Sequence, residues 1–388
     1  MPSPVYLDNA ATTRVRPEVR EAMLPYLGEV FGNPSSAHRY GRAARAGIEQ
    51  ARRQLATALG AEPSQIVFTS GGTEADNLAV TGAALAARAA GRKPHVAVSA
   101  VEHKAVLAAA HFVAALDGTE ELLPVTSDGI VALDALDAAL TRRPTLVSVM
   151  WVNNETGAVQ PVEAIAARCR EARVPFHTDA VQAFGQLPVR FEALGADLLA
   201  VSAHKVGGPK GVGALLIRSP ALIQPVVRGG SQQAGVRPGT ENAAGIVGFG
   251  RAAELAAREQ AEHAGRMGGL RDRLRDALRA AVPDVFVVDP PERAPHVLTV
   301  CVPGADSEAL LMHLDLAGVA AGSGSACTTG TVEPSHVLAA MGVPRELAIA
   351  AVRFSLGREN TADDVARAAE VFPAVVGKVR QLAGVLGR

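Results

Sequence analysis

The chain has 388 residues, of which 48% are hydrophobic and 20% charged, and its formal net charge is −1. This composition excludes a disordered chain, and the near-neutral charge gives no reason to expect attraction to nucleic acid or to a membrane surface. No apolar run approaches the roughly 20 residues that span a bilayer, and Met1–Asp8 lacks the basic and apolar regions of a signal peptide. We therefore expect a cytoplasmic protein.

Apolar and Ala-rich runs alternate along the first two thirds of the chain. The apolar runs predict strands at 66–68, 95–99, 146–150, 174–177, 198–201 and 213–217. The Ala-rich runs predict helices at about 73–88, 104–116, 133–140, 161–172 and 191–194. Strands that are apolar throughout and alternate with helices indicate an α/β fold, with a mainly parallel sheet covered by helices on both faces.

The last third of the chain has a different pattern. Helix formers dominate from about 242 to 281, which predicts one long connecting helix with a break at Gly268-Gly269. Shorter strands are expected at 297–302, 318–321 and 351–355, with helices at 307–316, 334–341 and 362–386. This arrangement favours a smaller α+β domain after the large one.

An acid and a lysine follow two neighbouring apolar runs. Asp179 ends the stretch that begins at Phe176, and Lys205 ends the stretch that begins at Asp197. The ends of parallel strands are where such folds bind ligands. Pyridoxal phosphate (PLP) requires a lysine for the Schiff base and a carboxylate that keeps the pyridine nitrogen protonated. Asp179 as a helix cap or surface ion-pair partner stays open, as does Lys210 as a second candidate lysine.

Three further segments follow strands. Phe68–Glu74, with its paired glycines before a helix, is typical of a phosphate-binding turn, or of an ordinary strand–turn–helix. His103, in Val101-Glu-His-Lys104, could stack on a cofactor ring and move protons, or be a structural histidine. Asn153-Asn154 suggests hydrogen bonds to a polar ligand, although a turn explains it almost as well.

The chain has three cysteines, which argues against a disulfide framework or a zinc site. Cys169 and Cys301 lie in helical and apolar runs, which indicates packing. Cys327 lies in a segment rich in Gly and Ser, so it is either a nucleophile on a mobile loop or an unreactive loop thiol. Arg353, on an otherwise apolar strand, is a candidate partner for a substrate carboxylate or for a structural salt bridge.

Together these segments resemble the cysteine desulfurases, within the PLP-dependent, fold-type I, class V aminotransferase-like superfamily. The resemblance covers nearly the whole chain and rests on Tyr6–Thr13, Phe31–His38, Thr69–Glu74, Val101–His103, Asn153–Gly157, His177–Gln182, Ser202–Lys205 and Gly324–Cys327. The last motif, with Glu333-Pro-Ser-His336, resembles the long-loop subgroup that serves nitrogenase and general iron–sulfur cluster assembly.

The resemblance implies a seven-stranded sheet and three segments: an N-terminal segment at 1–15 that packs with the small domain, a PLP-binding domain at 16–257, and a small domain at 258–388 that carries Cys327. It implies that Lys205 holds PLP as a Schiff base and that Asp179 pairs with the pyridine nitrogen.

The remaining implied roles concern the cofactor's other groups and the substrate. Gln182 would bond the ring oxygen, and His103 would stack on the ring and shuttle protons. The implied phosphate ligands are Gly72, Thr73, Ser202, His204 and, from the partner subunit of a homodimer, Thr240. The substrate carboxylate would be held by Asn154 and Arg353, with help from Asn33.

The implied reaction converts L-cysteine to L-alanine and leaves the sulfur on Cys327 as a persulfide, for a scaffold protein or another acceptor. No resident metal is implied, and a cluster on a scaffold to which Cys327 contributes stays open. So does the acceptor, because members that serve the general scaffold have a longer C-terminal tail than this sequence, which stops at Arg388. The alternatives are a same-fold selenocysteine lyase or aminotransferase, and a sulfur-relay or scaffold protein without turnover.

Overall fold

The computed structural model describes residues 4–323 and 333–386. Cys327 and most of its Gly/Ser-rich segment lie outside these described residues. Within them, no helix is both long enough and apolar enough to cross a bilayer.

The larger sheet has seven strands in the order β2-β8-β7-β6-β5-β3-β4. Its strands are β2 (Ile66–Thr69), β3 (His95–Ser99), β4 (Thr119–Leu123), β5 (Leu146–Ser148), β6 (Phe176–Asp179), β7 (Leu198–Ser202) and β8 (Gly213–Ile217). The run from β4 to β7 is parallel, whereas β8 is antiparallel to both β7 and β2. The expected mainly parallel α/β sheet is confirmed, and β2 ends at the same edge as the parallel strands.

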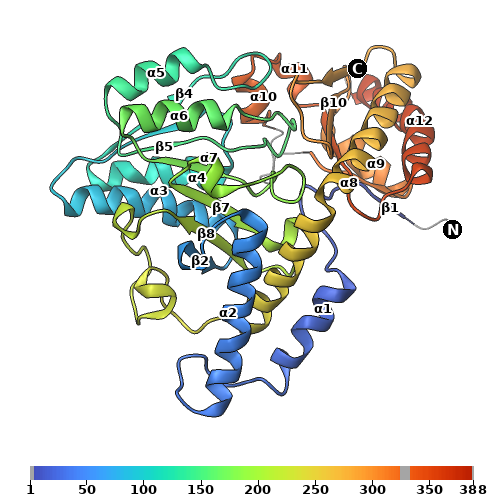
Figure 1. Cartoon of the computed structure of the whole chain (residues 1–388). Helices are drawn as coiled ribbons and strands as arrows, with labels where there is room; N and C mark the ends of the chain where they lie inside the picture. The colour runs from blue at the N-terminus through green and yellow to red at the C-terminus, as the bar shows by residue number, and fades with distance from the viewer. Residues whose placement is uncertain (1–3, 324–332, 387–388) are drawn as a thin grey trace.

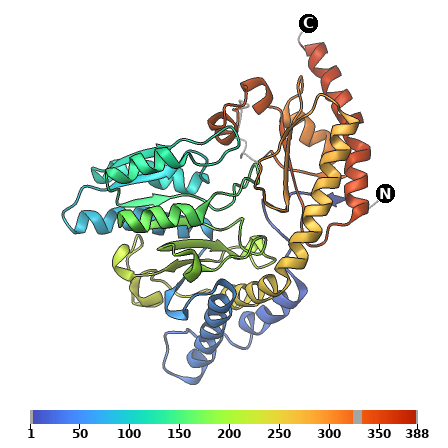
Figure 2. The same ribbon diagram turned by 45° about the horizontal axis from the view of Figure 1, so that its top comes forward.

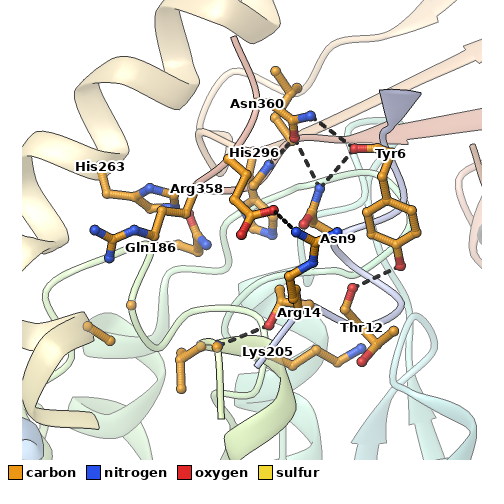
Figure 3. A pocket seen from close by; sticks show the side chains of 18 of the residues that line it. Tyr6, Asn9, Thr12, Arg14, Gln186, Lys205, His263, His296, Arg358 and Asn360 are labelled. Atoms are coloured by element: carbon orange, nitrogen blue, oxygen red, sulfur yellow. Dashed lines mark hydrogen bonds and ion pairs between the residues drawn. The ribbon is translucent and has the colours of Figure 1, made fainter. Parts of the chain in front are cut away.

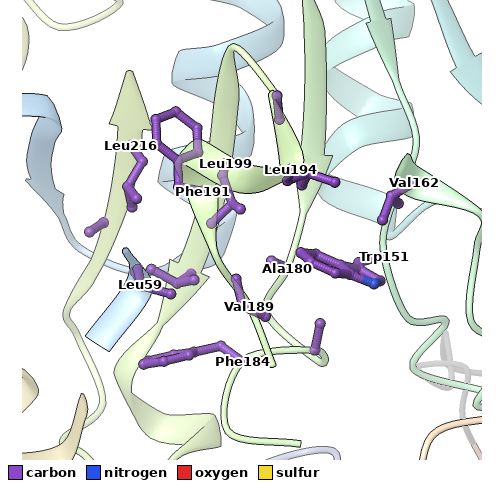
Figure 4. Packing of buried hydrophobic residues seen from close by; sticks show 14 of the residues in the cluster. Leu59, Trp151, Val162, Ala180, Phe184, Val189, Phe191, Leu194, Leu199 and Leu216 are labelled. Atoms are coloured by element: carbon purple, nitrogen blue, oxygen red, sulfur yellow. The ribbon is translucent and has the colours of Figure 1, made fainter. Parts of the chain in front are cut away.

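Helices cover both faces of this sheet (Figures 1 and 2). They are α2 (Arg39–Leu59), α3 (Gly72–Ala89), α4 (Lys104–Phe112), α5 (Leu133–Thr141), α6 (Val162–Ala172) and α7 (Phe191–Leu194). Successive residues of β7 pack on opposite faces: Leu198 belongs to the core with α3 and α4, and Leu199 to the core with α2, α5 and α6. Figure 4 shows Leu199 and Leu216 in the second of these cores, which also contains Phe191.

A second, smaller group of strands and helices is built mostly from the chain that follows the long helix α8 (Ala243–Ala281). Its sheet has the order β12-β10-β9, and a separate pair joins β1 to β11. The strands are β1 (Val5–Tyr6), β9 (Phe286–Val288), β10 (Val297–Cys301), β11 (Val319–Ala320) and β12 (Ala351–Ser355), and the helices are α9 (Ser307–Leu316), α10 (His336–Ala340), α11 (Arg345–Ala348) and α12 (Ala362–Leu386). One apolar core joins these strands to α8, α9 and α12.

Several elements were not predicted from the sequence: β1, β4, β9, α2, α11, the short helix α1 (Pro17–Met23) and the 3-10 helices other than Val113–Leu116, which lies within the helix expected at 104–116. The 3-10 helices span Leu24–Leu27, Pro63–Gln65, Val113–Leu116, Ala203–Lys205, Pro220–Leu222 and Gln232–Gly235. β4, of sequence Thr-Glu-Glu-Leu-Leu, is an edge strand with mostly exposed or half-exposed residues, so it carries no apolar run.

The expected break at Gly268-Gly269 is wrong, because α8 is continuous from Ala243 to Ala281. A glycine costs a helix only about 1 kcal/mol. Both ends of α8 are packed, with Phe249 in the core of the larger sheet and Leu274 in that of the smaller one. Packing at both ends therefore outweighs the weak propensity between them. The domain limit between 257 and 258 falls within this helix and stays a prediction.

Candidate active site

The C-terminal edge of the larger sheet gathers the polar residues that follow its strands. Asp179 ends β6 and Ser202 ends β7, while His103 and Asn154 follow β3 and β5. Gly72 begins α3 directly after β2. These residues are far apart in sequence, and they share one edge because their strands run in the same direction.

Lys205 lies at the end of a 3-10 helix that follows β7. Its Nζ donates hydrogen bonds to the carbonyl oxygens of Ala10 and Ala11, the latter at 2.8 Å. Burial, followed by the positive charge of Arg353, lowers the pKa of Lys205 to about 8, although Asp179 and Asp8 act in the opposite direction. A lysine with a lowered pKa is neutral often enough near neutral pH to act as a nucleophile.

Asp179 is buried, with 4% of its surface exposed. Its Oδ1 accepts a hydrogen bond from the Val181 backbone N–H at 2.8 Å. Burial raises the pKa of Asp179, and the nearby His103 and Lys205 oppose that rise. Asp179 is therefore a buried acid whose ionised form depends on cations in the site, rather than a surface ion-pair partner.

The turn before α3 lies close to the residues at the C-terminal ends of β6 and β7. A Cβ atom at Gly72 would lie 2.9 Å from Val181 Cγ2 and 3.7 Å from Ser202 Cβ. Ser202 Oγ is buried and has no hydrogen-bond partner among the described residues. A helix N-terminus beside an unpartnered buried hydroxyl is suited to a phosphate group. Thr73 is exposed at this turn.

His204 and Gln182 contact the N-terminal segment. His204 Nδ1 lies 3.1 Å from Thr12 Oγ1, and burial together with Lys205 and Lys210 lowers its pKa to about 4. Gln182 Nε2 donates to the Ala10 carbonyl oxygen at 2.8 Å. The same carbonyl thus accepts from both Gln182 and Lys205.

A cavity of about 690 Å³ adjoins these groups. Figure 3 shows it with Lys205, His263 and His296 among its lining residues. Lys210, the second candidate lysine, also lines the cavity but is exposed. The deeper placement and lowered pKa favour Lys205 over Lys210.

Arg353, on β12, is held between the two sheets. Its Nη2 is 2.7 Å from Asp8 Oδ1, and its Nη1 donates to the Asn154 carbonyl oxygen at 2.9 Å. Its Nε is buried without an acceptor among the described residues. The backbones of Arg353 and Gly322 exchange hydrogen bonds of 2.6 and 3.0 Å. The salt-bridge alternative is therefore present, and the Nε–H remains a donor without an acceptor among the described residues.

His103 caps the N-terminus of α4, where its Nδ1 accepts from the Ala105 backbone N–H at 3.1 Å. The ring is exposed. Because Nδ1 is engaged as an acceptor, Nε2 is the nitrogen that can carry and release a proton.

Two expected site residues make no polar contact with the site within the described part of this chain. Asn33 and Thr240 are both exposed, and among the described residues no hydrogen bond or ion pair joins either of them to Lys205, Asp179 or Ser202. Near Thr240, Arg237 forms an ion pair of 2.7 Å with Glu74 in the first turn of α3. This pair ties the segment that carries Thr240 to the helix of the glycine turn.

Sequence reasoning assigned no site role to Asp8, Ala10, Ala11 or His296. The alanines act through backbone carbonyls, which leave no residue-type signal. Asp8, Ala10 and Ala11 lie in the Tyr6–Thr13 motif, but the pairing of β1 with β11 that brings them beside β12 is a tertiary contact without a local sequence pattern. Cys169 and Cys301 are buried free thiols, as expected for packing residues.

Comparison with known proteins identifies relatives along nearly the whole chain. The family described as aminotransferase class-V matches residues 5–368. A cysteine desulfurase of Cereibacter sphaeroides is 49% identical and covers 97% of each chain, and the cysteine desulfurase IscS of Dictyoglomus turgidum is 45% identical, covering 97% of this chain and 96% of its own. A solved structure titled NifS-like protein superposes with a TM-score of 0.90 at 36% identity, covering 97% of this chain and 100% of its own. The chain therefore belongs to the aminotransferase class-V family and, within it, to the cysteine desulfurases.

Proposed function

We propose that this protein is a PLP-dependent enzyme that converts L-cysteine to L-alanine and transfers the sulfur to Cys327 as a persulfide. The observation that carries the proposal is the lysine with a pKa of about 8, at the strand edge that also holds the buried Asp179 and the glycine turn. The relatives' shared name, cysteine desulfurase, supports the substrate.

The residues present fit the cofactor. When bound, PLP accepts the electrons released at the substrate Cα. We assign its attachment to Lys205 and its pyridine nitrogen to Asp179, whose ionised form would gain a cationic partner. Its phosphate would lie at Gly72, Thr73 and the unpartnered hydroxyl of Ser202, with His204 beside them.

We assign the substrate carboxylate to Arg353 and Asn154. Among the described residues Arg353 Nε has no acceptor, and its Nη2 contacts Asp8. Because Asp8 already contacts Nη2, an incoming substrate carboxylate would compete with Asp8 for that nitrogen. His103 is assigned the protons that leave and return at the substrate carbon, through its Nε2.

The sulfur step falls to Cys327, which lies outside the described residues. Its thiolate would attack the sulfur of L-cysteine, so that an S–S bond forms and the Cβ–S bond breaks. The electron pair of the broken bond returns to the carbon skeleton, which is protonated to give L-alanine. Gly322, five residues before Cys327, exchanges backbone hydrogen bonds with Arg353, the residue assigned to the substrate carboxylate. This contact supports the assignment of the sulfur step to Cys327.

Several finer features belong to the same proposal. We place the enzyme in the long-loop subgroup, as a cytoplasmic homodimer in which Thr240 reaches the partner subunit's phosphate site, and we assign Asn33 a supporting contact with the substrate carboxylate. The exposure of Thr240 in the single chain supports its assignment. The sulfur acceptor would be an iron–sulfur scaffold or another protein that builds thio-cofactors.

A turnover assay tests the proposal. Protein loaded with PLP is incubated with L-cysteine, and alanine and protein-bound persulfide are measured. The wild type should form both, while Cys327→Ala should form neither and keep the visible absorbance band of lysine-bound PLP. Lys205→Ala should lose that band. Full alanine formation by Cys327→Ala would favour a selenocysteine lyase or aminotransferase, and an unchanged band in Lys205→Ala would point to Lys210.

A further inference from the structure

A buried histidine from the smaller sheet reaches into the candidate active site. His296 directly precedes β10, and 3% of its surface is exposed. Its Nε2 lies 3.1 Å from Gln182 Oε1, on the larger sheet's side of the cavity. Its Nδ1 has no hydrogen-bond partner among the described residues. The imidazole therefore makes one directed side-chain contact, and that contact is with Gln182.

The orientation of the Gln182 amide follows from its two neighbours. The Ala10 carbonyl can only accept, so the amide group that faces it at 2.8 Å must be the NH₂. The amide oxygen then faces His296. Burial lowers the pKa of His296 to about 3, so the ring is neutral and carries a single N–H. That proton belongs on Nε2, because an unprotonated Nε2 would place two lone pairs against each other.

We propose that His296 is a positioning residue that donates from Nε2 to Gln182 and so holds the amide with its NH₂ toward Lys205. Ala10 uses one of the two amide protons and also accepts from Lys205 Nζ. The other amide proton is thereby presented to the site. This inference rests on the proposed function, in which that proton goes to the ring oxygen of PLP.

The ring can be changed without removing the backbone anchor of His296. The His296 carbonyl accepts from the Leu356 backbone N–H at 2.8 Å, a bond that no side-chain substitution deletes. His263 offers a matched control, since it lines the same cavity and burial lowers its pKa to about 4, but no hydrogen bond to Gln182 involves it among the described residues.

The direction of the effect can be worked out. An N–H that donates to the ring oxygen favours its anionic form, so losing a fixed donor raises the pKa at which the absorbance of lysine-bound PLP titrates. A hydrogen bond to a charged group is worth on the order of one pKa unit. A Gln182 amide that is free to rotate still donates to the ring oxygen part of the time, so we expect the pKa of the absorbance change to rise by about 0.5 to 1.

The test compares His296→Leu, which cannot donate, with His296→Gln, whose amide can, and with His263→Leu. Each variant is loaded with PLP, and the pH midpoint of its absorbance band and its dissociation constant for PLP are measured. His296→Leu should show the raised midpoint and about threefold to tenfold weaker PLP binding, with His296→Gln and His263→Leu close to wild type. His296→Met replaces His296→Leu if the latter does not fold.

An unchanged midpoint in the apolar variant, or equal shifts in His296→Leu and His296→Gln, would overturn the positioning role. A shift of the same size in His263→Leu would also overturn it, because any loss of a cavity histidine would then suffice. These outcomes are distinct from failure of the proposed function, which would appear as no lysine-bound PLP in the wild type itself.

Discussion

Arg353 is predicted to lower the pKa of Lys205 through its charge, separately from any contact with substrate. Arg353→Met removes the positive charge that, after burial, lowers this pKa most, and it leaves the opposing negative charges of Asp179 and Asp8 in place. A unit charge acting over about 10 Å at an effective dielectric constant of about 20 changes a pKa by about one unit. The pKa of Lys205 should therefore rise from about 8 to roughly 9, and stay below its ordinary 10.5 because burial remains.

The assay is the rate at which the apoprotein attaches PLP, followed by absorbance across pH. Only the neutral amine attacks the aldehyde, so at about pH 8 the reactive fraction should fall from about one half to about one tenth. Arg353→Lys is the matched control. It keeps the charge and should keep the wild-type midpoint, while losing the forked geometry that suits a carboxylate, so its KM for L-cysteine should rise.

A wild-type pH midpoint for PLP attachment by Arg353→Met would show that the charge of Arg353 does not lower the pKa of Lys205. A midpoint that moves as far in Arg353→Lys as in Arg353→Met would show the same, since the effect would then come from packing. Thermal unfolding of both variants checks that the buried site still folds around Asp8.

Two further predictions concern stability. The pKa of Lys205 is about 8 in the folded protein, below its ordinary 10.5, so the free energy of unfolding of the apoprotein should increase as the pH rises from about 8 to 10.5. Denaturant titrations at several pH values should show that Lys205→Met lacks this increase. Parallel pH profiles of the wild type and the variant would contradict this. Gly72→Ala should cost about 1–3 kcal/mol and weaken PLP binding, because its Cβ meets Val181 at 2.9 Å, whereas Gly265→Ala, with nothing within 4 Å, should be neutral or stabilising. Equal unfolding and binding by the two alanine variants would exclude a close approach at Gly72.

The sequence predicts most of the larger sheet because its inner strands are apolar throughout. Leu198 and Leu199 face opposite cores, so β7 cannot alternate with polar residues and stands out as a run. β4 escapes this signal because it is an edge strand. α2 has the amphipathic pattern of a surface helix, with Ile48 and Leu55 buried among many arginines and alanines, and a search for apolar runs passes over it.

The candidate site, too, could be predicted only in part from the sequence. Asp179 and Lys205 could be placed together because each follows a strand, and parallel strands share an edge. The Ala10 carbonyl and His296 could not, since both come from outside the larger sheet. Their position depends on how β1 and β10 pack against the larger sheet, which is a tertiary property without a local pattern.

Three buried carboxyl groups of this region, those of Asp76, Glu102 and Asp179, differ in the charges around them. Burial raises the pKa values of Asp76 and Glu102 well above their usual range, and Asp179 adds to both. The Met150 backbone N–H opposes the rise at Glu102, but no cation among the described residues opposes either rise. Asp179 alone faces His103 and Lys205, which act against its own rise. The surrounding cations therefore favour the ionised, negatively charged form at Asp179 and not at Asp76 or Glu102. In the proposed function this charge is what a pyridine nitrogen requires, so the cations of the site, more than the carboxyl groups themselves, decide which acid can hold the cofactor.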